Sequence, residues 1–341
     1  MKRKEVYVLN VLLAVILLIL TYFIIFGKSG YSEIMTIVGG VDKRYILLAI
    51  FVMFLYFLIE AYNIKCLLKS LNENVSLIKV LKARFISFFF SSITPAATGG
   101  EPMQVYSLMQ DGVSFANGTL ASLINICSYQ IVIISLAVIS FILNFNIVPK
   151  QVVILFAIGV SLNFMALCIM MIFIFDKKLA KTLVNFVIKI MTKLKFKNID
   201  NLKEKFNRTL EKYNKQTDYI KSHKKEFIYS IIRTFVDMGI YFIVPYIIYR
   251  SFGLTRYDII LFFEIQAILF ASVSSIPLPG SIGVSESAFL ILYKRIYKEE
   301  LLRPSLVLTR GINFYLYVLI SFVVTLVFLF KGRKKNTNDM E

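Results

Sequence analysis

Long apolar stretches alternate with short polar connections along the whole chain. A helix needs about 20 mostly apolar residues to cross the hydrocarbon core of a bilayer. Stretches of this kind predict about six full spans, near residues 6–26, 45–66, 115–144, 150–175, 227–250 and 304–330. The first stretch is too long for the apolar part of a signal peptide, so we interpret it as a retained helix.

Two other apolar regions, 77–110 and 258–300, are interrupted by glycine and proline, which predicts two broken-helix hairpins. The interruptions share a pattern: Ser91-Ser92-Ile93-Thr94-Pro95 leads to Gly99-Gly100-Glu101, and Ser274-Ser275-Ile276-Pro277 leads to Gly280, Gly283 and Glu286. Because the flanking spans are expected to run in opposite directions, the two copies predict an inverted repeat. Secondary transporters are often built this way, with broken helices that form the substrate site near the bilayer midplane.

Composition supports the same class of protein. The hydrophobic fraction is 57% and the mean hydropathy is +0.71, whereas soluble domains contain about 45–50% apolar residues. We therefore predict an all-α, polytopic integral membrane protein in which residues 1–341 form one transmembrane domain. The longest polar stretch, a basic loop at 176–226, is too short and too polar to form an ordinary folded core of its own.

The formal net charge of +18 comes from lysines and arginines that cluster in loops between the apolar spans. Such loops favour anionic membrane lipids as partners, and nucleic acid binding is not expected. The positive-inside rule places the basic loop 176–226 and both termini in the cytoplasm. The hairpin at 77–110 would then enter the membrane from the cytoplasm, and the hairpin at 258–300 from outside.

Motifs for soluble catalysis are missing from the sequence. It contains no GxSxG, HExxH or P-loop context, only one histidine, and three cysteines that lie far apart. We therefore predict no catalytic residue, no metal site and no cofactor.

The two helix breaks predict a polar cavity, because unpaired backbone groups persist at membrane depth only where protein or water satisfies them. Glu101 and Glu286 follow the glycines at the start of new helices. Each acid either complements its helix dipole, or faces the cavity and binds a cationic headgroup or a proton. Arg310 is expected to hold a phosphate, with snorkelling to the interface as the alternative. The candidate headgroup-binding residues are Glu101, Glu286, Arg310, Gly99, Gly100, Gly280, Gly283, Asn313 and Asn125.

Other polar residues interrupt the apolar spans. Arg233 and Asp237 are four residues apart, which predicts a structural ion pair on one helix face, with cavity lining as the second interpretation. Asn125 belongs to a stripe with Gly118 and Ser122, a pattern that is more often close helix packing. Further candidates rank lower because they lie near expected membrane interfaces: Glu60, Arg84, Glu264 and Gln266.

The segments from Thr94 to Pro102 and from Pro277 to Glu286 resemble the two signature motifs of the lysylphosphatidylglycerol synthase transmembrane region, also called the flippase-like domain family. The resemblance covers nearly the whole chain. One departure is Ser281, where the family commonly has a second glycine.

In bifunctional members of this family, a soluble domain transfers lysine from lysyl-tRNA to phosphatidylglycerol, and the membrane region moves the product to the outer leaflet. This protects the cell against cationic antimicrobial peptides. The resemblance implies a phospholipid flippase or lipid transporter of a bacterial plasma membrane, acting on an aminoacylated or other phospholipid and linked to such antibiotic resistance. We expect no lysyltransferase domain in this chain.

Two other functions stay open. The chain could be a phosphatidylglycerol lysyltransferase or the membrane subunit of an aminoacyl-phospholipid synthase, which would need a separate aminoacyltransferase partner. It could also be a membrane scaffold that transports nothing. Whether it is an enzyme is therefore left undecided by the sequence.

Overall fold

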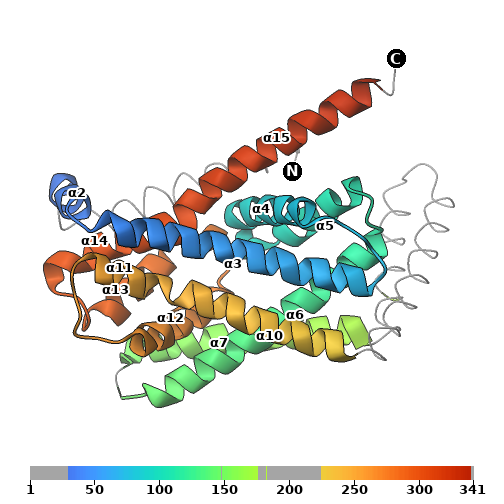
Figure 1. Cartoon of the computed structure of the whole chain (residues 1–341). Helices are drawn as coiled ribbons and strands as arrows, with labels where there is room; N and C mark the ends of the chain where they lie inside the picture. Colours follow the sequence, from blue (N-terminus) through green and yellow to red (C-terminus); the bar gives the residue numbers. More distant parts are fainter. Residues whose placement is uncertain (1–29, 147, 176–181, 183–223, 339–341) are drawn as a thin grey trace, which may run out of the picture.

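The computed structural model describes residues 30–146, 148–175, 182 and 224–338 (Figure 1). The predicted span at 6–26 and most of the basic loop at 176–226 lie outside these residues. Within them every regular element is helical, and five helices are long and apolar enough to cross a membrane. The prediction of a polytopic all-α membrane protein is confirmed.

The other five predicted spans each coincide with a long helix. These are α3 (Lys43–Ser70), α6 (Phe115–Leu143), α7 (Lys150–Phe175), the pair α10 (Lys224–Phe242) and α11 (Val244–Ser251), and the last span. That last span begins at Glu299, earlier than expected, and consists of α14 (Glu299–Arg310), the π-helical turn η3 (Gly311–Tyr315) and α15 (Leu316–Asn338). A short helix that the apolar pattern did not predict, α2 (Tyr31–Gly39), precedes α3.

Local chemistry sets several of these boundaries. Asp42 caps α3 by accepting a hydrogen bond from the Arg44 backbone N–H at 2.9 Å. Pro245 lies in the first turn of α11, and a proline cannot donate the hydrogen bond that would continue α10 without a break. The outer face of α3 exposes Leu47 and Phe51, which suits contact with lipid chains.

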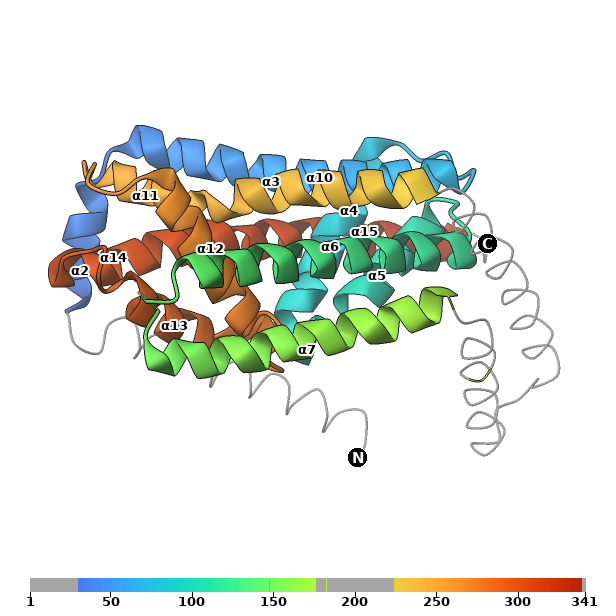
Figure 2. The same cartoon turned by 90° about the horizontal axis from the view of Figure 1, so that it is seen from below.

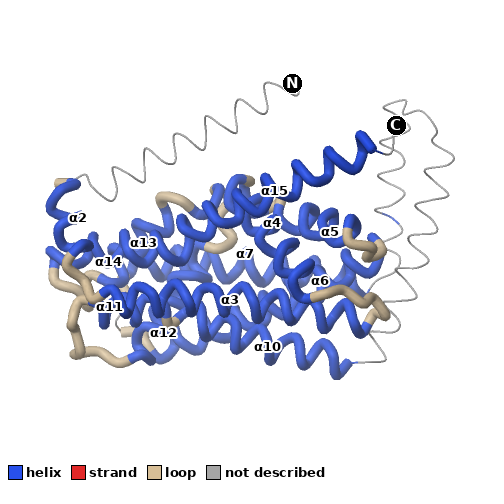
Figure 3. The backbone as a smooth tube through the Cα atoms, turned by 45° about the horizontal axis from the view of Figure 1, so that its top comes forward, coloured by secondary structure: helices blue, strands red, loops and turns tan. Residues whose placement is uncertain are grey.

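The two predicted hairpins are present at the predicted positions. The first consists of α4 (Leu77–Ile93), the 3₁₀ turn η1 (Pro95–Ala97) and α5 (Gly100–Gln110); the second consists of α12 (Ile259–Val273), η2 (Pro279–Ser281) and α13 (Val284–Tyr293). Figures 1 and 2 show that the first hairpin opens at the end of the bundle where α3 ends and α10 begins. The second opens at the opposite end, beside α11 and the start of α14. Most other loops gather at these two ends (Figure 3).

The two hairpin tips have the same backbone conformation. Thr94 has φ −112° and ψ 143°, and Leu278 has φ −113° and ψ 140°. A proline follows each of them, and then two residues with positive φ: Ala96 and Ala97 in the first tip, Gly280 and Ser281 in the second. The tips also contact each other, η1 against η2. Equal tips on hairpins that enter from opposite ends give the arrangement of an inverted repeat.

The helices after the two tips each begin at a glycine. Gly99 is the N-cap of α5, so Glu101 lies within the first turn and does not cap the helix. Gly283 caps α13, and Glu286 is the third residue of that helix. In both cases a glycine takes the cap position, because the chain leaves a tight turn there.

Stacked aromatic rings connect the first hairpin to α3 and to the last span. The Phe57 ring stacks on Phe85 at 4.9 Å and on Tyr317 at 4.8 Å between ring centroids. These contacts link α3, α4 and α15. The packing holds the first hairpin against the last span, which carries Arg310.

Candidate functional site

A buried ion pair lies where the second hairpin meets the last span. Arg310 Nε donates to Glu286 Oε1 at 2.7 Å, and the Gly283 backbone N–H donates to Glu286 Oε2 at 2.6 Å. The Glu286 side chain is fully buried and that of Arg310 is 9% exposed. The Glu286 carboxylate thus occupies a pocket made of a guanidinium and a helix N-terminus, both of which favour anions.

Two further contacts fix the position of Arg310. Its Nη2 donates to the Gly280 carbonyl at 3.2 Å, and its guanidinium carbon lies 4.4 Å from the centroid of the Phe314 ring. Phe314 belongs to the π-helical turn η3, a form of helix that is frequent at functional sites. A Cβ atom on Gly280 would come within 2.3 Å of Phe314 Cζ, so any larger residue would have to displace the ring. The sequence-predicted residues Gly280, Gly283, Glu286 and Arg310 therefore form one cluster.

Asn313 lies in the same π-helical turn. It is 3% exposed, and its Oδ1 has no hydrogen-bond partner among the residues that the structure describes. A buried amide oxygen without a partner is uncommon in folded proteins, and this oxygen is able to accept a hydrogen bond from a bound group.

Around the first hairpin, the two glycines serve packing. A Cβ atom on Gly100 would lie 2.9 Å from the Ser87 carbonyl oxygen, so α4 and α5 touch backbone to backbone. The Gly99 N–H donates to Thr94 Oγ1 at 2.9 Å and closes the tip. Both residues shape the hairpin, and their nearest neighbours belong to α4 and to Thr94 at its C-terminal end.

Glu101 is half-buried beside Gln104, whose Nε2 lies 3.4 Å from Glu101 Oε2 and donates to Ser122 Oγ at 3.1 Å. Gln104 is 1% exposed, and its Oε1 has no partner within the described part of the chain. A carboxylate and an unpaired amide oxygen are both hydrogen-bond acceptors. Together they form a place suited to a donor such as an ammonium group.

A second buried ion pair, which the sequence ranked low, lies beside Glu101. Arg84 Nε is 2.6 Å from Glu60 Oε2, with side chains only 11% and 10% exposed. Arg84 interacts electrostatically with Glu101 as well. Both residues were assigned to the membrane interface because they lie toward one end of their apolar runs. The re-entrant path of α4 places them in the interior instead.

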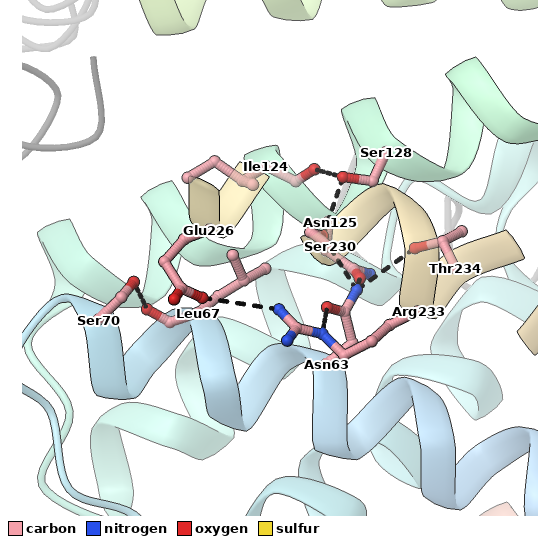
Figure 4. A network of polar contacts seen from close by, with 10 residues as sticks. All are labelled: Asn63, Leu67, Ser70, Ile124, Asn125, Ser128, Glu226, Ser230, Arg233 and Thr234. Atoms are coloured by element: carbon pink, nitrogen blue, oxygen red, sulfur yellow. Dashed lines mark hydrogen bonds and ion pairs between the residues drawn. The ribbon is translucent and has the colours of Figure 1, made fainter. Parts of the chain in front are cut away.

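The predicted ion pair of Arg233 with Asp237 is not formed. Arg233 Nε donates to Asn63 Oδ1 at 2.8 Å, and its Nη2 lies 3.8 Å from Glu226 (Figure 4). Side chains on a helix lean toward its N-terminus, so Arg233 reaches back toward Glu226 and away from Asp237. Asp237 is left buried, with its Oδ1 unpaired among the described residues.

Asn125 belongs to this second network and not to the hairpin cluster. It accepts a hydrogen bond from Asn63 Nδ2 at 2.9 Å, and the same amide group donates to Ser230 and Thr234 (Figure 4). The network joins α3, α6 and α10. Sequence reasoning missed Asn63, although an amide within the apolar run at 45–66 was a usable signal.

Comparisons with known proteins give relatives that cover about three quarters or more of the chain. A UPF0104 membrane protein of Pyrococcus horikoshii is 25% identical over 347 residues, which covers 98% of this chain and 98% of the relative. A second UPF0104 membrane protein, from Archaeoglobus fulgidus, is 24% identical over 270 residues, covering 76% of this chain and 79% of that protein.

The paired glycine-rich hairpins agree with a family match that spans both of them. Residues 7–321 match the family described as lysylphosphatidylglycerol synthase TM region, and this range contains Glu101, Glu286 and Arg310. The chain therefore belongs to the lysylphosphatidylglycerol synthase TM region family.

Proposed function

We propose that this protein is a phospholipid transporter whose headgroup site lies between the two hairpins. The observation that carries the proposal is the anion pocket at Arg310 and Gly283, now filled by the Glu286 carboxylate. A lipid phosphate offers the same anionic oxygens to the same donors. The lipid phosphate would displace the Glu286 carboxylate from the pocket. When no lipid is bound, Glu286 accepts the hydrogen bonds of Arg310 and Gly283 in its place.

The amine of an aminoacylated lipid fits the other half of the site. Glu101 and the unpaired Gln104 Oε1 supply acceptors on α5, while the tips η1 and η2 touch between the two halves. Phosphate at Arg310 and amine near Glu101 would therefore engage both hairpins at once. Asn313, with its own unpaired oxygen, is proposed to contact the headgroup beside Arg310.

Opposite entry of the hairpins supports alternating access. The first hairpin opens at the end where α7 ends and α10 begins, and the second at the other end (Figure 2). Because the connection between α7 and α10 is basic, we assign the first end to the cytoplasm. We propose a cell membrane location with the C-terminus on that side and with anionic lipids around the basic loop.

The test is leaflet exchange of headgroup-labelled lipid in liposomes that contain the purified protein. The double variant Glu286→Gln with Arg310→Gln removes both charges of the pocket. It should slow exchange about tenfold or more, because a hydrogen bond to a charged group contributes about 1.5–3 kcal/mol. The matched control is Glu300→Gln, an exposed acid at the start of α14.

The outcomes separate the parts of the proposal. Exchange in wild-type proteoliposomes that equals exchange in protein-free vesicles would contradict transport. Exchange at the wild-type rate in the double variant would contradict the phosphate pocket. Glu101→Gln should slow lysyl-phosphatidylglycerol more than phosphatidylglycerol, and equal slowing of both lipids would contradict an amine site at Glu101.

A further inference from the structure

The interior around the first hairpin contains more acidic than basic side chains. Glu60 is paired with Arg84, and both interact electrostatically with Asp237, while Glu101 interacts with Arg84 and Glu60. Three carboxyl groups therefore surround one guanidinium. At the second hairpin, by contrast, the charges are balanced, because Glu286 pairs with Arg310.

Asp237 is the group that this imbalance leaves unsatisfied. It lies in the C-terminal half of α10 with 2% of its surface exposed, and its Oδ1 has no hydrogen-bond partner among the described residues. The nearest arginine on its own helix, Arg233, is bound to Asn63 and Glu226. The arginine nearest to Asp237 on its own helix is therefore already engaged by other groups.

Side chains from several helices surround Asp237. The titratable and charged groups there are Tyr56 and Glu60 of α3, Arg84 of α4, Tyr129 of α6, and Arg233 and Tyr241 of α10 itself. From α12, the Phe270 ring packs on Tyr241 at 5.4 Å between centroids. Tyrosine hydroxyls can donate to a carboxylate or accept from a carboxylic acid, so they suit either protonation state.

An ionised carboxylate without a partner is strongly disfavoured in an apolar interior, and binding a proton removes its charge. A divalent metal would need several ligands, and no group of three or more His, Cys, Asp or Glu side chains in the described residues is placed to hold one. A proton needs only one oxygen. The unpaired Asp237 Oδ1 is such an oxygen.

We propose that Asp237, facing the Glu60–Arg84 pair, is a proton-binding site that couples lipid movement to the proton gradient. The coupling rests on the proposed lipid transport, whereas the proton site itself does not. Asp237 takes up a proton that comes from the water at one face of the membrane, and an O–H bond forms on the carboxylate. That bond breaks again when the proton is released to the water at the other face. Because Glu101 shares the same arginine with Glu60 and Asp237, an ammonium group near Glu101 and a proton on Asp237 neutralise the same cluster.

The proton site is tested first without transport, by infrared spectroscopy of the full-length protein in lipid at neutral pH. Wild type should show the carbonyl absorption of a protonated carboxyl group. That signal should disappear in Asp237→Asn and persist in Glu264→Gln, a matched control whose acid accepts from Asn144 at 2.8 Å. An identical protonated-carboxyl signal in wild type and Asp237→Asn would overturn the proposal.

The coupling is tested in liposomes with an imposed pH gradient. For one proton per lipid, a gradient of about one pH unit can sustain up to about tenfold leaflet asymmetry, since each unit is a factor of ten in proton activity. Wild type and Asp237→Glu should approach this asymmetry and lose it with a protonophore. Asp237→Asn should still exchange lipid but show no response to the gradient.

Each result of the liposome test has a separate meaning. Wild-type exchange that ignores the gradient overturns the coupling and leaves lipid transport standing. Absence of exchange in wild type overturns the proposed transport and the coupling together, and the infrared result then decides the proton site alone. An Asp237→Asn variant that still responds to the gradient overturns the role of Asp237.

Discussion

The two hairpins share a backbone and differ in what surrounds it. In the first, the tip from Pro95 to Thr98 is exposed. In the second, Pro279 is buried and Gly280 lies under the Phe314 ring, with its carbonyl bound to Arg310. Both tips thus contain two residues with positive φ, but the first tip is exposed and the second is covered by Phe314 and bound to Arg310.

This difference shows how an inverted repeat can divide its roles. The repeated backbone brings the two tips into contact, and the neighbouring helices then determine the chemistry around each tip. The last span supplies a cation to the second hairpin, while α3 and α10 supply acids to the first. A symmetric scaffold thereby offers an anion pocket in one half and an excess of acceptors in the other.

The largest expected effect comes from breaking the balanced half. Arg310→Gln should lower the free energy of unfolding by about 3–5 kcal/mol, because it leaves the buried Glu286 carboxylate without its cation. Adding Glu286→Gln should recover most of the loss. The measurement is unfolding in mixed detergent micelles followed by circular dichroism; a double variant as unstable as Arg310→Gln would contradict a charge effect.

A smaller effect is expected from closing space under Phe314. Gly280→Ala should destabilise the protein by about 1–3 kcal/mol through overpacking, since the new Cβ would lie 2.3 Å from Phe314 Cζ. Gly39→Ala is the matched control, because nothing lies within 4 Å of that position. Equal stability of both variants in the same micelle assay would show that the second tip is not closed in this way.

The smallest effects distinguish the tips by backbone strain. Ala96 has φ 51°, so Ala96→Gly should stabilise the protein by about 0.5–1 kcal/mol, the relief of left-handed strain less the entropy of glycine. Ser281 also has φ 51°, but its Oγ donates to the Val273 carbonyl at 2.9 Å. Ser281→Gly should therefore change stability little. A clear gain at Ser281 with none at Ala96 would reverse the comparison.

Sequence patterns predicted the framework well, because apolar length and Gly/Pro breaks act locally. Spans such as 115–144 and both hairpins fall where the pattern put them. The hydrogen-bond and ion-pair partners of a side chain depend on which helices pack together. Local sequence pattern does not encode that packing. Arg233 therefore bonds to Asn63, 170 positions away in the chain, instead of Asp237, and Asn125 joins that network and not the hairpin site.

Burial was misjudged for a related reason. Glu60 and Arg84 lie near the ends of their apolar runs, where a spanning helix would reach the interface. Since α4 turns back inside the bundle, that position becomes interior, and the two residues pair at 2.6 Å. The Glu286–Arg310 contact was likewise outside local pattern, although both residues were selected as candidates.

Thiol labelling from the two sides of the membrane tests the opposite entry of the hairpins most directly. In a background with Cys66, Cys127 and Cys168 replaced by serine, single cysteines are introduced as Asn74→Cys, before α4, and Thr255→Cys, before α12; both positions are exposed. With a membrane-impermeant reagent on intact cells, Thr255→Cys should be labelled, and Asn74→Cys only after permeabilisation. Labelling of both positions from the same side would contradict the account.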